Sequence, residues 1–270
     1  MADWIKKIYE WLIFYGTNFN TLLKVSATRI LFDRLSLSLS LFMSILDALW
    51  TLAVLHIVYA HIDKINNWRF EEALMATGFF FVFSGIVEMI VHPSINFLVR
   101  SVRDDTILYL LTKPLPVLVY TVAYYKMEKL SKCIIGLFIV ILCLDVLKIK
   151  LYPTGVIALI FSIVISVLMV YSIFFIIANF YVLALEGDKV EELFLGIIRI
   201  ARFPVQLFPE PLRSIFYFIL PLAFISTVPA EILLNRFDLR LILYALAVNL
   251  ILLAINIKSF NAILKNYINR

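Results

Sequence analysis

Long runs of apolar residues, interrupted by very few charges, dominate the pattern along this chain. Between Arg34 and Asp63 the only Asp, Glu, Lys or Arg is Asp47, and between Lys150 and Glu186 there is none. A helix needs about 20 predominantly apolar residues to cross the roughly 30 Å of hydrocarbon in a bilayer. The runs therefore predict membrane-spanning helices and exclude a soluble globular domain.

Six such runs predict an all-α integral membrane fold with six transmembrane helices. The expected spans cover residues 35–60, 73–97, 115–147, 154–185, a segment between 190 and 233, and 239–260. A single helix through the uncharged run 151–185 would be about 50 Å long at 1.5 Å per residue, so it would tilt or project beyond the bilayer. Two closely apposed spans are the alternative, although no turn residue interrupts the run after Gly155.

The basic residues indicate the orientation of these spans. The chain is 63% hydrophobic and only 16% charged, with a net charge of +5. If both termini are cytoplasmic, 18 Lys and Arg residues fall on the inner side and 6 on the outer side. Lys and Arg concentrate in cytoplasmic loops of membrane proteins, so we expect both termini inside and no nucleic-acid partner.

The residues before the first span have an amphipathic pattern. Trp4, Ile8, Trp11 and Tyr15 recur at spacings of three and four, with Lys and Glu between them. An apolar face with Trp and a basic remainder is typical of a helix in the membrane interface, and a cytoplasmic helix packed on a partner is the alternative. We expect residues 1–34 to form this interface region and residues 35–270 to form one transmembrane domain.

Motifs for catalysis are missing from the sequence. There is no G-x-x-x-x-G-K-[ST] phosphate loop, no G-x-S-x-G and no H-E-x-x-H. His56, His61 and His92 do not have the spacing of a metal site, which needs three or four convergent ligands. We therefore expect a transport subunit rather than an enzyme, with no catalytic residue and no metal.

Five polar residues lie inside or near the expected spans: Asp47, Glu88, Asn179, Asn249 and Asn256. Polar groups at membrane depth normally face the bundle interior or water, and they often mark a substrate or ion pathway. The alternative is hydrogen bonding between helices or, for a charge, a position at the interface. For the asparagines we favour interhelical hydrogen bonds, whereas for the two acids both interpretations are open.

A charged segment with an apolar stripe, residues 100–116, follows the second span. Acidic residues near its start favour a helix N-terminus, and Pro114 would end that helix. A short amphipathic cytoplasmic helix is a natural docking element, and a plain surface loop is the alternative. The candidate docking residues are Arg103, Asp104, Asp105, Ile107, Leu108 and Leu111.

Five prolines interrupt residues 199–230. Broken backbone at membrane depth is tolerated only where protein or a water-filled cavity satisfies its polar groups, so this stretch predicts a pathway or a re-entrant element. Arg199 and Arg202 would share one face of a helix, and they would either face a cavity for an anionic amphiphile or reach the interface. The candidate pathway or gate residues are Arg199, Arg202, Pro204, Pro221 and Pro229.

These two segments, in this order, resemble the ABC-2 type permease family, the membrane subunits of ABC exporters. The likeness is carried by Leu-Leu-Thr-Lys-Pro-Leu-Pro at 110–116 and by the proline-rich region from Phe203 to Ala230. The resemblance implies two permease subunits on two cytoplasmic ATPase subunits, which bind ATP and Mg, with no cofactor in this chain. It also implies that the interface helix and the helix after span 2 transmit ATPase closure.

The resemblance further implies a re-entrant hairpin on the outer side before the last span, with residues 190–208 as the fifth span. Hydropathy alone favours residues 214–230 as that span, so both assignments stay open. A bacterial inner (plasma) membrane is the expected location. The apolar, aromatic-rich spans suit a lipid-like or amphipathic cargo, but a lipid-facing surface gives the same composition.

Two other classes of function are consistent with a six-span chain. A non-ABC secondary transporter or channel would be favoured by broken helices in matched halves, whereas the breaks here cluster in one half. A membrane scaffold without transport would lack an ATPase partner. A neighbouring reading frame for a P-loop ATPase would distinguish these classes from an ABC permease.

Overall fold

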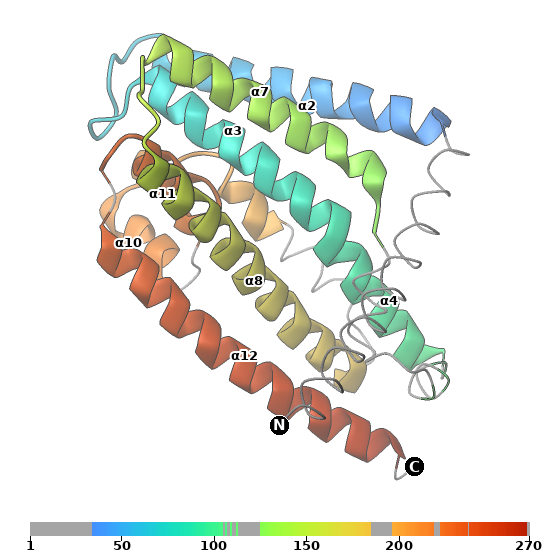
Figure 1. Ribbon diagram of the computed structural model, residues 1–270. Helices are drawn as coiled ribbons and strands as arrows, with labels where there is room; N and C mark the ends of the chain where they lie inside the picture. The colour runs from blue at the N-terminus through green and yellow to red at the C-terminus, as the bar shows by residue number, and fades with distance from the viewer. Residues whose placement is uncertain are drawn as a thin grey trace, which may run out of the picture.

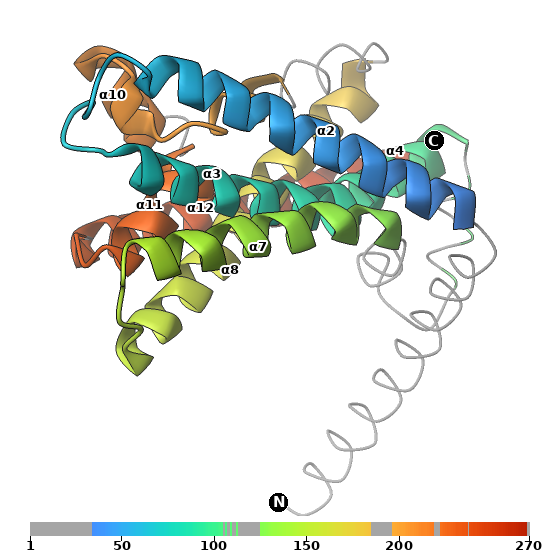
Figure 2. The same cartoon turned by 90° about the horizontal axis from the view of Figure 1, so that it is seen from above.

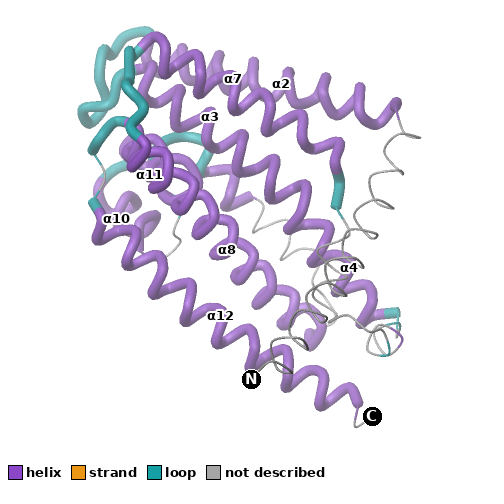
Figure 3. Tube along the Cα trace, viewed as in Figure 1, coloured by secondary structure: helices purple, strands orange, loops and turns teal. Residues whose placement is uncertain are grey.

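The computed structural model describes residues 34–104, 106, 109, 112, 125–184, 196–218, 222–236 and 238–268. Within these ranges the chain is helical, without strands, apart from one isolated bridge between Ile65 and Trp68 (Figure 3). The expected interface helix at residues 1–33 lies outside the described part of the chain.

The described part of the chain forms a series of helices and short helical turns. They are α2 (Arg34–Tyr59), α3 (Phe70–Ile86), the π-helix η1 (Val87–Val91), α4 (His92–Arg103), the 3₁₀ turn η2 (Met127–Lys129), α7 (Leu130–Val146), α8 (Pro153–Ala184), the 3₁₀ turn η3 (Val205–Leu207), α10 (Glu210–Phe218), α11 (Ala223–Leu233) and α12 (Leu239–Ile268). A short helical segment also covers residues 196–200.

Among the described residues, four helical stretches are long and apolar enough to cross a membrane. They are α2, the continuous stretch Phe70–Arg103, the Pro153–Asn179 part of α8 and the Leu239–Phe260 part of α12. These stretches agree with the first, second, fourth and sixth expected spans. The uncharged run forms one unbroken helix of 32 residues, so the alternative of two apposed spans is wrong.

The third and fifth expected spans lie only partly within the described residues. The third corresponds to α7, whose 17 residues extend about 26 Å at 1.5 Å per residue. In the region of the fifth, α10 and α11 lie at 96° to one another and together give one further candidate, either a broken span or a re-entrant loop. Residues 214–230 therefore do not form one straight span.

The helix α3 lies in the interior of the bundle, packed against α7, α11 and α2, whereas α12 packs against α8 (Figures 1 and 2). Thirteen of the 17 residues of α3 are buried. The peripheral helices expose large apolar side chains instead, for example Trp50 of α2, Phe138 of α7 and Ile251 of α12. An apolar exterior around a packed interior is the arrangement expected of a bundle whose solvent is hydrocarbon.

Glycines allow α3 and α7 to approach each other closely. A Cβ atom added at Gly136 would lie 2.6 Å from the carbonyl oxygen of Gly78 and 2.6 Å from the backbone nitrogen of Val82. One added at Gly85 would lie 2.5 Å from Sγ of Cys133. Small residues at such positions let helix backbones meet in membrane proteins, where apolar burial alone does not drive association.

Asparagines join α8 to α12, which run in the same direction (Figure 1). Nδ2 of Asn249 donates to the carbonyl oxygen of Ile165 and Nδ2 of Asn256 donates to that of Ser172, each at 3.0 Å. Asn179 of α8 donates to a serine hydroxyl of α12 at 2.7 Å. The interpretation of these asparagines as interhelical hydrogen-bonding residues is therefore confirmed.

The two ends of the bundle are formed by different segments of the chain. We call the end at which α2 and α7 begin and α4 stops the basic end, since it carries Arg34, Arg103 and Lys129. The opposite end, with residues 60–69, 147–152 and 234–236, is the loop end. There the buried carboxylate of Glu72 accepts a hydrogen bond from Arg236 at 2.7 Å, which connects α3 to the segment between α11 and α12.

Candidate functional site: a charged cavity between the helices

A π-helical turn places Glu88 inside the bundle. Pro93 has no N–H, so the carbonyl of Met89, four residues earlier, loses its normal helical donor. The backbone N–H of Lys126 donates to this carbonyl instead, at 2.9 Å. The wide turn η1 spans residues 87–91, and such turns occur often at functional sites.

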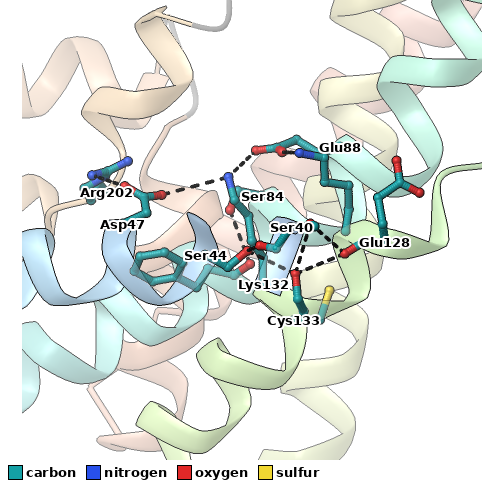
Figure 4. A network of polar contacts seen from close by, with 12 residues as sticks. Ser40, Ser44, Asp47, Ser84, Glu88, Glu128, Lys132, Cys133 and Arg202 are labelled. Carbon is teal, nitrogen blue, oxygen red and sulfur yellow. Dashed lines mark hydrogen bonds and ion pairs between the residues drawn. The ribbon is translucent and has the colours of Figure 1, made fainter. Parts of the chain in front are cut away.

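Five charged side chains form a continuous series that alternates in sign (Figure 4). Nη1 of Arg202 lies 2.9 Å from the Asp47 carboxylate, and Nζ of Lys132 lies 3.9 Å from its other oxygen. Lys132 also contacts Glu88 at 2.5 Å, and Lys129 contacts Glu88 at 3.2 Å. The series joins α2, η1, η2, α7 and the segment after residue 200, which are far apart in the sequence.

Arg202 is held by several groups of the bundle interior. Its Nη1 donates to Oγ1 of Thr51 at 3.0 Å, and the guanidinium carbon lies 5.5 Å from the centre of the Phe80 ring. Its backbone carbonyl accepts from Oγ1 of Thr77 at 3.2 Å. At 1.5 Å per residue, its partner Asp47 lies about 20 Å from the start of α2 and about 18 Å from its end. Arg202 thus pairs midway along the bundle rather than at a helix end.

A cavity of about 410 Å³ lies beside this series. Its apolar walls come from Phe80, Val87 and Ile198. Its charged walls carry two acids and five bases: Asp47, Glu88, Lys126, Lys129, Lys132, Arg199 and Arg202. The cavity is therefore positively charged overall, even though two acids take part in its ion pairs.

A second cavity, of about 490 Å³, adjoins the first and shares part of its charged wall. The shared residues are Asp47, Lys126, Lys129 and Lys132. The remaining wall consists of Glu128 on η2 and one face of α2, with three serines and the apolar Leu39 and Met43.

Serine hydroxyls connect that face of α2 to the start of α7. Ser44 and Ser131 share a hydrogen bond of 3.0 Å, and Ser40 donates to the carbonyl oxygen of Glu128 at 2.9 Å. These contacts fix the position of the lysines on η2 and α7 relative to Asp47.

The structure brings some of the expected pathway residues together and separates others. Arg199 and Arg202 both line the cavity. Pro204 follows shortly after Arg202 and precedes η3, while Pro229 lies inside α11. Pro221 is outside the described residues.

The expected docking residues lie only partly within the described chain. Arg103 is the last residue of α4, and Asp104 follows it, with its N–H donating to the carbonyl of Arg100 at 2.8 Å. The charged start of this segment is therefore the end of the second spanning helix, and Asp104 is the C-cap residue of α4. Asp105, Ile107, Leu108 and Leu111 lie outside the described residues, so docking stays a prediction.

The sequence interpretation missed the lysines that complete the site. Lys126, Lys129 and Lys132 were assigned only to the orientation of the loops, although their spacing of three places them on one side of a helical turn. Thr51 was missed as well, because a threonine inside an apolar run carries no distinctive signal. A series of lysines at spacing i, i+3 directly before a span is the sequence signal that could have identified the basic wall of the cavity.

Comparison with known proteins identifies a family. A family model described as ABC-2 family transporter protein matches residues 45–270. No curated protein and no solved structure matches the chain. The matched range includes every residue of the charged series.

Proposed function

Because the chain belongs to the ABC-2 family of transporter proteins, we propose that it is the permease subunit of an ATP-driven exporter. The family match, which covers residues 45–270, carries this proposal. A charged cavity enclosed by apolar helices supports it, since a permease has to offer polar surroundings at membrane depth.

The energy would come from a separate chain. The sequence has no phosphate-binding loop, and a P-loop supplies the backbone N–H groups and the lysine that hold nucleotide phosphates. ATP and Mg would therefore bind to cytoplasmic ATPase subunits, and this chain would contain no cofactor of its own. Two permease subunits with two ATPase subunits form the proposed assembly.

We propose six spans with both termini in the cytoplasm, in a bacterial inner membrane. The excess of Lys and Arg on the predicted inner side supports this orientation, which makes the basic end the cytoplasmic end. In this arrangement α7 belongs to the third span, and the bent pair of α10 and α11 is a re-entrant element on the outer side.

The test is assembly with an ATPase. The chain would be expressed alone and together with the P-loop ATPase from a neighbouring reading frame, and ATP hydrolysis would be measured after purification in detergent. We expect no hydrolysis by the chain alone, copurification of the ATPase, and loss of activity when the P-loop lysine of the ATPase is replaced. Robust hydrolysis by the isolated chain, or no association with any such ATPase, would contradict the proposal.

A second test addresses the docking segment. Leu108→Asp with Leu111→Asp places charges on the apolar stripe expected to enter a groove of the ATPase, so copurification should fall while membrane insertion is kept. Leu151→Asp is the matched control, since Leu151 is 54% exposed at the loop end. Equal copurification of both variants would show that the segment does not dock.

A further inference from the structure

We propose that the charged cavity binds the anionic headgroup of an amphipathic substrate. The inference rests on the proposed function, because it names the substrate class of a permease whose cargo the family does not specify. It is carried by the charge balance of the cavity, by the position of its cations and by the adjoining cavity along α2.

The charges that line the cavity do not balance. Arg199 makes a further interaction of its own, and without it four bases still face two acids. A network that serves only to hold helices together would be expected to neutralise its charges, since an unneutralised charge inside a helical bundle is costly. An excess of cations around the cavity is favourable when an anion occupies the space beside them.

Two of the cations flank one carboxylate. Asp47 lies between Arg202, at 2.9 Å, and Lys132, at 3.9 Å, so its carboxylate occupies a position where a ligand anion would meet two bases. Nε of Arg202 is buried and has no hydrogen-bond partner among the described residues. The guanidinium therefore keeps donor capacity beyond its bonds to Asp47 and Thr51, as a phosphate or carboxylate ligand requires.

The adjoining cavity indicates that the ligand has an apolar part. Its outer wall contains Leu39 and Met43, which are 59% and 61% exposed on the face of α2. Its inner wall contains Lys126, Lys129 and Lys132, shared with the first cavity, beside the acids Asp47 and Glu128. A molecule whose acyl chain lies along α2 can thus place its headgroup near the lysines while the acyl chain stays in apolar surroundings.

Binding to the purified full chain tests this inference without the ATPase. Native mass spectrometry in an uncharged detergent would measure the affinity for lysophosphatidylglycerol and for lysophosphatidylcholine with the same 14-carbon chain. We expect the anionic lipid to bind at least about tenfold more tightly, a difference of about 1.4 kcal/mol. Glycerol 3-phosphate, which carries the anion without the chain, should not displace it at the same concentration.

Substitutions of the cavity's bases and of its acid should change the affinity for the anionic lipid in opposite directions. Lys126→Gln and Arg202→Gln should each weaken binding of the anionic lipid severalfold and leave the zwitterionic lipid unaffected. Asp47→Asn should strengthen binding of the anionic lipid, because it removes the internal anion that competes for the same cations. Lys64→Gln and Arg240→Gln, which change exposed bases at the loop end, are the matched controls and should have no effect.

Several results would overturn the inference. Equal affinity for the two lipids, or unchanged affinity in Lys126→Gln and Arg202→Gln, would show that the cavity is not an anion site. Weaker binding in Asp47→Asn would assign the ion pairs a structural role only, and displacement by glycerol 3-phosphate would identify a small soluble anion instead of an amphiphile. These outcomes are independent of ATPase assembly, so a failure of the proposed function and a failure of this inference can be distinguished.

Discussion

The contact between α3 and α7 predicts a graded loss of stability when its glycines are replaced by alanine. A Cβ at Gly136 would lie 2.6 Å from two backbone atoms, about 0.8 Å closer than the lower limit of ordinary contact at 3.4 Å. One at Gly85 would lie 2.9 Å from the backbone nitrogen of Cys133. At Gly78 the nearest atom, at 2.9 Å, is a methyl group of Val140.

The magnitude follows from how far each neighbour can move. Backbone atoms cannot rotate away, so Gly136→Ala has to separate the two helices, and overpacking of this kind costs about 1–3 kcal/mol. The better helix propensity of alanine returns up to about 1 kcal/mol. We therefore expect Gly136→Ala to lower the free energy of unfolding by about 1–2 kcal/mol, Gly85→Ala by somewhat less, and Gly78→Ala least, since a side chain can shift.

Reversible unfolding in mixed micelles of dodecyl maltoside and dodecyl sulfate, followed by tryptophan fluorescence, measures this free energy. Gly155→Ala is the matched control, because a Cβ there would meet nothing within 4 Å. Gly155→Ala should therefore be neutral or stabilise the chain by up to about 1 kcal/mol. If Gly136→Ala were as stable as Gly155→Ala, the close approach of α3 and α7 would be wrong.

Three further predictions concern other contacts. Asn249→Leu and Asn256→Leu should each lower the free energy of unfolding by about 0.6 kcal/mol, the average for interhelical hydrogen bonds in membranes, when measured in the same micelle titration. Arg236→Gln should lower it by about 2 kcal/mol, because Glu72 is left buried without its counter-ion, and a double variant with Glu72→Gln should recover part of that loss. The two cysteines, both buried in α7, should react with a membrane-permeant maleimide only along the unfolding curve, and fast labelling of the native chain would contradict their burial.

Much of the fold could be predicted because it depends on local composition. The uncharged run that became α8 had no turn residue after Gly155, and a single helix satisfies all its backbone groups in lipid. The region of the fifth span could not be assigned in this way. A hydropathy average over residues 214–230 does not register a bend, whereas the structure divides the region into α10 and α11 at 96°.

The candidate site was predictable only in part, for a different reason. Asp47 and Glu88 stood out because charges are rare in spans, but their roles depend on partners that tertiary packing brings to them. Lys132 is one such partner, and the sequence interpretation used it only as a topological charge. The π-helical turn had a signal in Pro93, since a proline inside a span frees a carbonyl, but the donor from Lys126 could not be identified without the structure.

The bonds between α8 and α12 have a mechanical consequence. Asn249 and Asn256 contact carbonyls of Ile165 and Ser172, so donors and acceptors are both seven residues apart and keep one register. Sliding one helix along the other would break both bonds together, and carbonyls on the same face of α8 recur only after about one helical turn, roughly 5.4 Å. Small displacements during a transport cycle should therefore carry α8 and α12 as one rigid lever, with hinges at its contacts to the rest of the bundle.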